Sequence, residues 1–316
     1  MKFDAGLRRV VTRVLAVAAL VLQMPAFAHD VTPFEGVTAF TIDTKAGGFT
    51  RHTLYLRPTK AATTPPPAVV MLHYLRGRGD DMADLIEASR IVRDFGAWVL
   101  LPDAIAGNWN YGSGSLIGGV SALANDVSFL SDLIKTSITN YGLDPHRIYM
   151  AGYSNGGLMT MRFACDHPEQ IAAAGNVARV TMRSSDAKAC KPTLPTPFLM
   201  MNGDADPVST YDGTKSFGVT LTMSAPATAA FWAQINGCAK TPVGSELPDT
   251  IADGTTIHLD TYSGCTALGE VDFYTVRNGG HTWPGAIGFS PELGPTSQDV
   301  DATSLLMKYL LRYSRP

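Results

Sequence analysis

Charged side chains are scarce in this sequence of 316 residues, at 17% of the chain, against roughly 25% in an average globular protein. The formal net charge is −3, so the basic surface that nucleic acids require is missing. Apolar residues make up 45%, which excludes a disordered chain because a core can form. The 30 glycines and 20 prolines follow no repeat, which excludes collagen-like and low-complexity structures.

Long apolar runs are missing after residue 28. The segment before it starts with basic residues, continues with the apolar run Val14–Leu22 and ends at the small-residue site Ala26-Phe27-Ala28. This order is typical of a secretory signal peptide, residues 1–28. A membrane anchor is the alternative, but the run is short for a span. We therefore expect a secreted or periplasmic protein, cleaved after Ala28, without stable membrane association.

Cysteine is also scarce, with four residues and no CxxC or CxxH spacing. The missing spacing disfavours a metal site, and export favours disulfides. Four cysteines allow three connectivities. Of these we favour the pairing that is local in sequence, Cys165–Cys190 and Cys238–Cys265. Each bond would close a loop of about 25 residues and stabilise the fold by roughly 3 kcal/mol in the chain-entropy model.

Strands and helices alternate along most of the chain, which predicts an α/β fold with a mostly parallel sheet and helices on both faces. We treat residues 29–316 as a single domain, since no repeat or linker divides them. Strands are expected at Val37–Thr44, Phe49–Arg57, Ala68–His73, Ala97–Leu101, Arg147–Tyr153, Ile171–Val177, Pro197–Asn202, Thr255–Thr261 and Val271–Val276. Helices are expected at Asp81–Arg93, Ser121–Asn140, Asn155–Cys165, Ala227–Ile235 and Asp301–Tyr313.

Residues 152–156 read Gly-Tyr-Ser-Asn-Gly and lie between an expected strand and an expected helix. A nucleophile elbow has this context, because glycines permit a tight turn that lifts the serine hydroxyl to the start of the helix. We interpret Ser154 as a nucleophile, with the backbone N–H of Asn155 placed to stabilise an oxyanion. A plain glycine-rich turn is the alternative.

A serine nucleophile needs a base, and in this architecture the base is a histidine late in the chain. His281 follows the last expected strand, in a loop at the sheet edge where catalytic groups gather. The other candidate, His258, lies in a strand that alternates with polar residues and is expected at the surface. We predict that His281 is the base, rather than a histidine that merely holds a loop.

The acid that orients the base should follow the strand Pro197–Asn202. Asp204 and Asp206 both lie there. Pro207 fixes an extended or turn geometry at Asp206, so we favour Asp206 over Asp204. A surface turn rich in aspartate is the alternative.

The second oxyanion donor is expected in the loop after the third strand. The backbone N–H of Tyr74 or Leu75 is the candidate donor there. His73, which precedes them, is interpreted as a structural histidine.

Together these segments resemble the secreted polyhydroxybutyrate depolymerase and feruloyl or acetylxylan esterase group of α/β-hydrolases, which includes carbohydrate esterase family one. The resemblance rests on residues 152–157, 204–208 and 279–285. It implies the α/β-hydrolase fold, with Ser154 as nucleophile, His281 as base and Asp206 as the orienting acid.

The resemblance also implies substrate contacts and disulfides. Trp109, Asn110 and Trp283 would lie on the substrate side of the cleft, with ordinary core packing as the alternative for the two tryptophans. The four cysteines stand where the family has disulfides, which supports the local pairing. Tyr74 stands where the family commonly has a small glycine, so its side chain is expected to reshape the oxyanion loop or narrow the cleft.

We therefore expect a secreted serine esterase that needs no metal or organic cofactor. The expected substrate is polyhydroxybutyrate or another hydroxyalkanoate polyester, or their oligomers or small esters. Soluble oligomers are favoured because the chain carries no appended binding domain. A feruloyl or acetylxylan esterase is one alternative, and a non-catalytic exported binding protein on the same fold is another.

Overall fold

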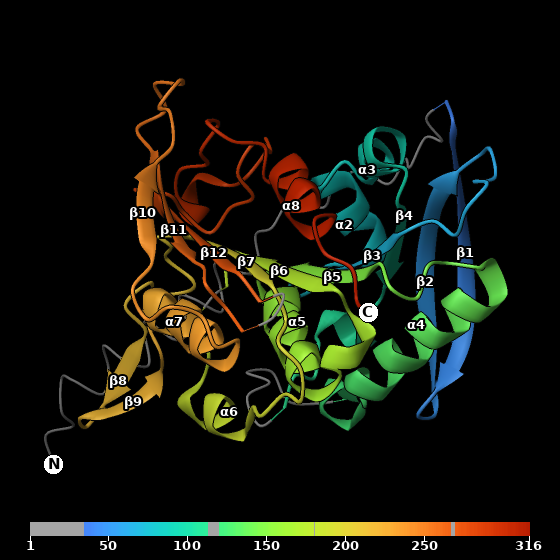
Figure 1. Cartoon of the computed structure of the whole chain (residues 1–316), viewed down its shortest axis with the longest axis horizontal. Helices are drawn as coiled ribbons and strands as arrows, with labels where there is room; N and C mark the ends of the chain where they lie inside the picture. Colours follow the sequence, from blue (N-terminus) through green and yellow to red (C-terminus); the bar gives the residue numbers. More distant parts are fainter. Residues whose placement is uncertain (1–34, 113–119, 180, 267–268) are drawn as a thin grey trace, which may run out of the picture.

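A central sheet organises the molecule. The computed structural model describes residues 35–112, 120–179, 181–266 and 269–316, and the predicted signal peptide lies outside them. The sheet has ten strands in the order β1-β2-β4-β3-β5-β6-β7-β12-β11-β10 (Figure 1). Strands β4, β3, β5, β6, β7 and β12 run parallel, and the strands at both edges are antiparallel. The strands are β1 Val37–Ala46, β2 Phe49–Pro58, β3 Ala68–Leu72, β4 Trp98–Pro102, β5 Ile148–Tyr153, β6 Ala173–Val177, β7 Phe198–Gly203, β10 Val243–Glu246, β11 Thr256–Tyr262 and β12 Val271–Arg277.

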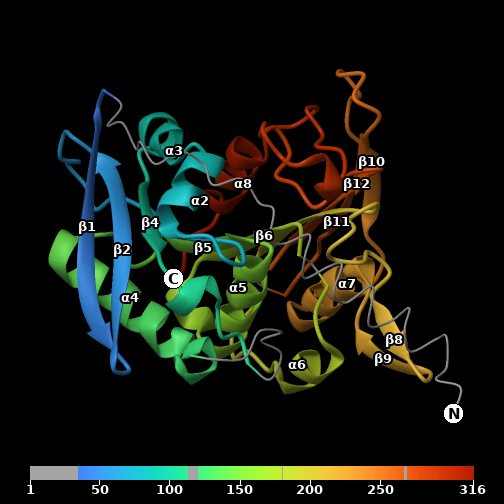
Figure 2. The ribbon, with the colours of Figure 1, turned by 180° about the vertical axis from the view of Figure 1, so that it is seen from behind.

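Helices cover both faces of the sheet, as Figures 1 and 2 show from opposite sides. One buried cluster joins the sheet to α2 Gly79–Leu85, α3 Ala88–Phe95 and α8 Ala302–Leu310. The other joins it to α4 Asp126–Tyr141, α5 Asn155–Asp166 and α7 Ala225–Ile235. The short helix α6 Ser184–Ala189 lies beside this second layer (Figure 1). Burial of the central strands on both faces explains why their sequences are continuous apolar runs.

Each predicted strand is present, with its ends shifted by at most two residues. The predicted helix Asp81–Arg93 is wrong in one respect, because the chain forms two helices that meet at Glu87, whose φ is +50°. On one continuous helix, Ile86 and Ile91 would point about 140° apart. The break allows both side chains to be completely buried, which offsets the cost of a left-handed non-glycine residue.

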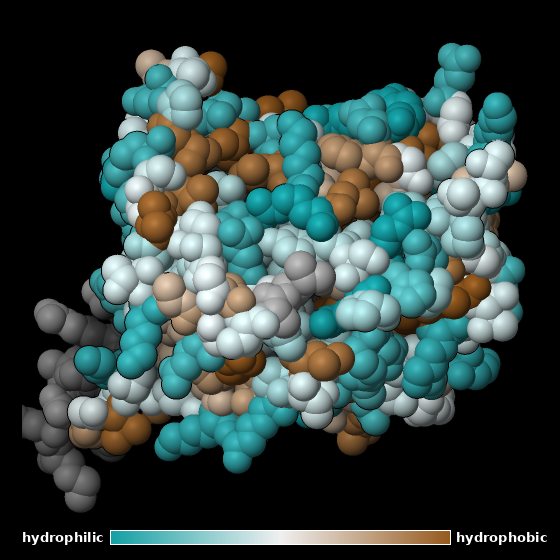
Figure 3. All heavy atoms as spheres, in the orientation of Figure 1, coloured by the Kyte–Doolittle hydropathy of each residue, from teal (hydrophilic) through white to brown (hydrophobic). Residues whose placement is uncertain are grey.

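The predicted helix Ser121–Asn140 begins five residues later than expected. The Asn125 side chain caps α4 by accepting a hydrogen bond from Ser128 N, and Val120–Leu123 form a separate 3₁₀ turn. The sequence analysis also missed a hairpin of β8 Thr214–Ser216 and β9 Val219–Thr222. Its apolar side chains Phe217, Val219 and Leu221 are exposed. The hydropathy view shows hydrophobic surface at the lower left (Figure 3), where Figure 1 places this hairpin.

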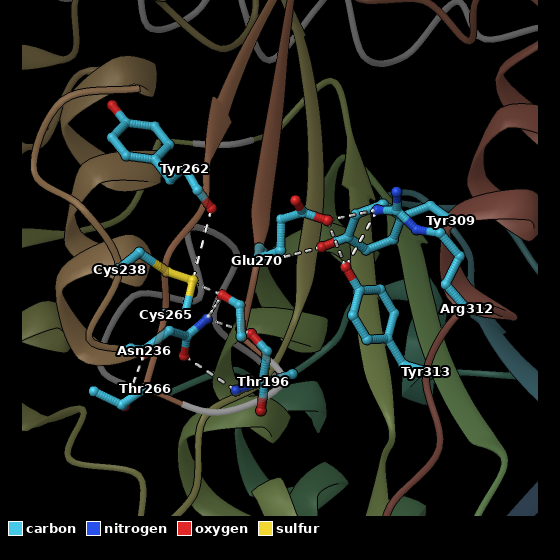
Figure 4. The surroundings of a disulfide bond; sticks show 11 residues. Thr196, Asn236, Cys238, Tyr262, Cys265, Thr266, Glu270, Tyr309, Arg312 and Tyr313 are labelled. Atoms are coloured by element: carbon cyan, nitrogen blue, oxygen red, sulfur yellow. Dashed lines mark hydrogen bonds and ion pairs between the residues drawn. A yellow bond between two sulfur atoms is a disulfide. The ribbon is translucent and has the colours of Figure 1, made fainter. Parts of the chain in front are cut away.

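Two disulfides link the helices of one layer to neighbouring segments. Cys165–Cys190 joins the end of α5 to the residue after α6, and Cys238–Cys265 joins the residues after α7 and β11. This is the local pairing favoured from the sequence. Beside the second bond, the buried amide of Asn236 contacts Thr196 and Gly269 (Figure 4). No helix in the described ranges is both long enough and apolar enough to cross a membrane.

Candidate active site

Ser154 lies on a sharp turn between β5 and α5. Its φ is +54°, a conformation that costs a non-glycine residue of order 1–3 kcal/mol. The turn is possible because its neighbours lack side chains. A Cβ on Gly152 would lie 2.3 Å from the carbonyl carbon of Gly156, and a Cβ on Gly156 would lie 2.1 Å from Leu72 O. The geometry is that of a nucleophile elbow.

Three side chains from the carboxyl edge of the sheet form one hydrogen-bonded chain. His281 Nε2 lies 2.8 Å from Ser154 Oγ, and His281 Nδ1 lies 2.7 Å from Asp206 Oδ2. Because a carboxylate accepts, His281 donates through Nδ1 and Nε2 is left to accept the serine proton. Ser154 is 8% exposed, whereas the histidine and aspartate side chains are buried. The structure thus brings together the three residues predicted to act together.

The structure also distinguishes the two candidate acids. Asp206 Oδ1 accepts hydrogen bonds from the backbone of Val208 and Ser209 at 2.7 and 2.6 Å, which leaves Oδ2 to face the imidazole. The exposed Asp204 instead caps the turn after β12, where it accepts a bond from Asn278 N. The aspartate beside the proline therefore reaches the histidine, and the other one does not.

Tyr153 is a residue of this site that the sequence analysis missed. Its hydroxyl donates to the carbonyl oxygen of His281 at 2.7 Å, and the two rings lie 5.5 Å apart between centroids. Burial, followed by the charge of Asp206, raises the pKa of the Tyr153 phenol well above its ordinary value. The phenol therefore stays protonated and fixes the histidine backbone. Its position directly before Ser154 in the sequence is the signal that could have identified it.

The start of α5 carries the predicted oxyanion donor. Asn155 is the first residue of the helix, so its backbone N–H has no acceptor within the helix. Its side chain is fixed on both sides. Oδ1 accepts from Trp109 N at 2.9 Å, and Nδ2 donates to Asn108 Oδ1 at 3.2 Å. These two bonds hold the backbone N–H of Asn155 in place beside Ser154.

The side chain of Tyr74 points into the core rather than into a cleft. Its ring is buried against Tyr153, edge to face, at 5.6 Å between centroids. Its carbonyl oxygen accepts from Gly77 N and from His73 Nδ1. The large side chain therefore packs in the core against Tyr153, the residue before Ser154. This differs from the expectation that it would narrow the cleft.

His73 is structural, as expected. It is fully buried, donates through Nδ1 to Tyr74 O and accepts at Nε2 from Ala104 N at 3.0 Å. Burial is the largest of the effects that lower the pKa of its imidazole. His258 lies on β11 with Glu246 and Asp260 as partners and does not join the site.

The three predicted substrate contacts are engaged within the protein. Trp109 and Trp283 are 0% and 1% exposed, and their indole N–H groups donate to His73 O and Thr303 Oγ1. Both rings are core residues rather than walls of an open cleft, because the loops that carry them fold onto the sheet. The Asn110 side chain donates to the carbonyl oxygens of residues 122 and 124, so it fastens its loop to the turn before α4.

A buried ion pair anchors that loop. Arg51 Nη2 and Asp126 Oδ1 lie 2.7 Å apart, with both side chains almost completely buried. The other carboxylate oxygen of Asp126 accepts from Asn110 N at 2.7 Å, and Arg51 also donates to Asp103 O. The pair therefore connects β2 and α4 to residues 103–110, the segment that contacts Asn155 at the start of α5.

A hollow of about 130 Å³ runs along α5 from Leu158 to the Cys165–Cys190 disulfide, with Tyr111 and Met182 on its walls. It begins one helical turn after the serine, and none of the three hydrogen-bonded side chains lines it. The described part of the chain contains no cluster of three or more His, Cys, Asp or Glu side chains suited to a metal ion.

Comparison with known proteins places the sequence in a family. The sequence profile of the esterase PHB depolymerase family matches residues 50–223, more than half of the chain. The chain belongs to this family. This confirms the resemblance inferred from the sequence segments.

Relatives in the family carry different names. The chain is 29% identical over 224 residues to feruloyl esterase B of Piromyces equi, covering 68% of this chain and 39% of that protein. It is 28% identical over 187 residues to the poly(3-hydroxybutyrate) depolymerase of Ralstonia pickettii, covering 53% and 37%. The chain spans between 37% and 57% of the length of three curated relatives that it matches.

Solved structures agree on the fold. The acetyl xylan esterase from Aspergillus awamori superposes with a TM-score of 0.55 at 17% identity, covering 78% of this chain and 94% of that one. A thermostable esterase gives a TM-score of 0.54 at 17% identity, covering 90% and 64%. At this identity the likeness concerns the fold, which is the α/β-hydrolase fold predicted from the sequence.

Proposed function

We propose that this protein is an exported serine esterase that hydrolyses carboxylic esters through an acyl-enzyme. The observation that carries the proposal is the chain of hydrogen bonds from Ser154 through His281 to Asp206, mounted on a strained elbow. Family membership supports it, since the family is named for esterases.

In the proposed mechanism Ser154 Oγ attacks the ester carbonyl while His281 Nε2 takes its proton. Asp206 holds the imidazole and stabilises its positive charge. The N–H of Asn155, with a second donor near Tyr74, binds the oxyanion. His281 then returns the proton to the leaving alcohol, and water releases the acid by the same steps in reverse. Every catalytic group in this proposed reaction belongs to a residue of the chain itself.

The proposed substrate is a hydroxyalkanoate polyester or its oligomers. The poly(3-hydroxybutyrate) depolymerase relative and the family profile support this class. A feruloyl esterase is the second candidate, because the match to feruloyl esterase B covers a larger share of this chain. A third candidate, a non-catalytic binding protein, predicts no turnover of either class.

Parallel assays on hydroxybutyrate oligomers and methyl ferulate test the proposal. Ser154→Ala should abolish nearly all turnover by the purified protein, whereas Ser128→Ala, an exposed serine on α4, should retain it. Oligomer cleavage alone supports the polyester class, and ferulate release alone supports the second candidate. Equal turnover by the wild type and Ser154→Ala would contradict the serine mechanism.

Export is part of the proposal as well. Two disulfides within the described residues suit an oxidising compartment. The full-length chain, expressed in a bacterial host, should appear outside the cytoplasm with His29 as its first residue, as N-terminal sequencing would show. Retention of residues 1–28 on a cytoplasmic product would contradict it.

A further inference from the structure

Arg179 lies beside the elbow and takes no part in the mechanism above. It follows β6 and Ala178, whose φ is +57°, at the carboxyl edge of the sheet. Its carbonyl oxygen accepts from Asn176 Nδ2 and lies 3.5 Å from the place where a Cβ on Gly157 would be. Since Gly157 is in the first turn of α5, Arg179 adjoins the start of the helix that carries Ser154.

The side chain of Arg179 is half-buried, and its guanidinium has no partner among the described residues. Its Nε is inaccessible to water and makes no hydrogen bond, and no ion pair of this side chain exists among the described residues. Burial lowers the pKa of the guanidinium more than any other effect on it. Seven other arginines are paired with carboxylates: Arg51, Arg78, Arg90, Arg147, Arg162, Arg277 and Arg312. An arginine offers five N–H donors. The buried Nε leaves one of them unsatisfied, which is costly, while the two terminal nitrogens are not among the buried unsatisfied atoms and can meet a ligand from solvent.

The nearby groups do not supply the missing acceptor. Asp206 and Tyr111 are close enough to Arg179 to act on its charge. However, Asp206 is beyond ion-pair distance, and both its oxygens are occupied by His281 and by two backbone N–H groups. Burial raises the pKa of the Tyr111 phenol, so Tyr111 presents a neutral hydroxyl. No carboxylate of the described residues pairs with this guanidinium, so the carboxylate of a bound substrate can take that place.

We propose that Arg179 binds the carboxylate of an acidic ester substrate and directs hydrolysis to the ester nearest that carboxylate. This rests on the proposed function. A planar guanidinium matches a carboxylate with two parallel hydrogen bonds. A hydroxyalkanoate oligomer ends in such a carboxylate, a few bonds from its last ester, whereas a neutral feruloyl ester has none. The site thus favours oligomers with a free acid end.

The reaction at that ester balances without a further reactant. A bond forms between Ser154 Oγ and the carbonyl carbon of the last ester, and the bond to the alcohol oxygen breaks. The alcohol oxygen takes the proton that His281 received from the serine, and the terminal hydroxy acid leaves with its carboxylate on Arg179. Water then hydrolyses the acyl-serine. The enzyme would therefore release monomers from the acid end.

An electrostatic role toward the triad is the rival explanation. If Arg179 only stabilised the charge of Asp206, its loss would lower kcat for every ester alike and shift the pH profile of each. Carboxylate binding instead predicts a loss confined mainly to acidic substrates and expressed mainly in KM. The two explanations therefore predict different ratios of kcat/KM between an acidic ester and its neutral counterpart.

The turnover test uses the linear hydroxybutyrate dimer and the same dimer with its carboxylate converted to a primary amide. Wild-type kcat/KM should favour the free acid by about ten- to a hundredfold, the value of a hydrogen bond to a charged group. Arg179→Met should bring the ratio near one, and Arg179→Lys should keep part of it. Arg147→Gln, which removes an equal charge at the opposite edge of the sheet, should keep the full ratio.

A binding measurement separates this inference from the proposed function. Calorimetry should show that Ser154→Ala binds the acid dimer. The double variant that carries both Ser154→Ala and Arg179→Met should bind the same dimer at least tenfold more weakly. If the wild type hydrolyses no ester but this difference is found, the proposed function fails and the carboxylate site stands. A preference that survives Arg179→Met, a wild-type ratio near one, or binding that is absent or independent of Arg179 overturns the inference.

Discussion

Ser154, His281 and Asp206 come from three different strand ends, and each is held by groups that do not react. The backbone of residues 208 and 209 orients Asp206, Tyr153 fixes the backbone of His281, and glycines leave room for the turn at Ser154. If these side chains act as proposed, such supports keep the atoms of the proposed reaction at hydrogen-bond distance, so that it requires little reorganisation.

His73 gives a prediction about stability and pH. Burial lowers the pKa of its imidazole in the folded protein, while the unfolded chain titrates near 6.5. Below about pH 6.5 the unfolded state therefore binds the extra proton, and the free energy of unfolding decreases as the pH falls. Its contribution is fully present above that pH. His73→Gln should reduce the slope between pH 5 and 6.5 by up to about 1.4 kcal/mol per pH unit.

Denaturant unfolding at several pH values measures this slope. His146→Gln, at an exposed histidine, serves as the control and should unfold with the wild-type slope. Identical slopes in the wild type and His73→Gln would show that His73 is not held neutral by the fold.

At the scale of elements, the turn from β5 into α5 depends on close backbone contact. Gly156→Ala would place a Cβ 2.1 Å from Leu72 O and 2.7 Å from His73 O, and backbone atoms cannot move aside cheaply. We expect this variant to lose most activity and a few kcal/mol of stability, within the range of strained core substitutions. Kinetics together with thermal unfolding would check it. Wild-type kinetics in Gly156→Ala would contradict the tight elbow.

The ion pair between β2 and α4 gives a second prediction at this scale. Asp126→Ala leaves Arg51 buried without its partner and frees Asn110 N, so the free energy of unfolding should fall by about 3–5 kcal/mol. Asp132→Ala, at an exposed residue of the same helix, is the control and should change little. Urea unfolding of both variants decides the matter. A loss below 1 kcal/mol for Asp126→Ala would mean that the pair does not anchor the loop.

The elements that could be predicted from the sequence are those with a local signal. Buried strands are apolar runs, and the elbow is a serine between glycines at a strand–helix junction. Pro207 was a sufficient local reason to prefer Asp206. The break at Glu87, the burial of Trp109 and Trp283, and the unpaired Arg179 depend on contacts between segments far apart in sequence. No local pattern records such contacts.

At the scale of the whole molecule, the three hydrogen-bonded side chains lie at the carboxyl edge of the sheet. The disulfides link α5 and the segment after α7, on one face of the sheet, to neighbouring segments. The bonds close loops with sequence separations of 25 and 27 residues. Removing either should cost roughly 3 kcal/mol in the chain-entropy model. Two double variants test this, one with Cys165→Ser and Cys190→Ser and the other with Cys238→Ser and Cys265→Ser. Each should unfold at a lower temperature than the wild type in calorimetry. An unchanged Tm for both would show that neither bond contributes to stability.

Covalent labelling of Ser154 tests the central claim most directly. A fluorophosphonate reacts with a serine that is activated by a histidine, and intact mass spectrometry counts the adducts. The account predicts one adduct per chain, located on the peptide that contains Ser154, and none in Ser154→Ala or His281→Ala. A wild-type chain that stays unlabelled, or a label that persists in Ser154→Ala, would contradict the assignment of Ser154 as the nucleophile.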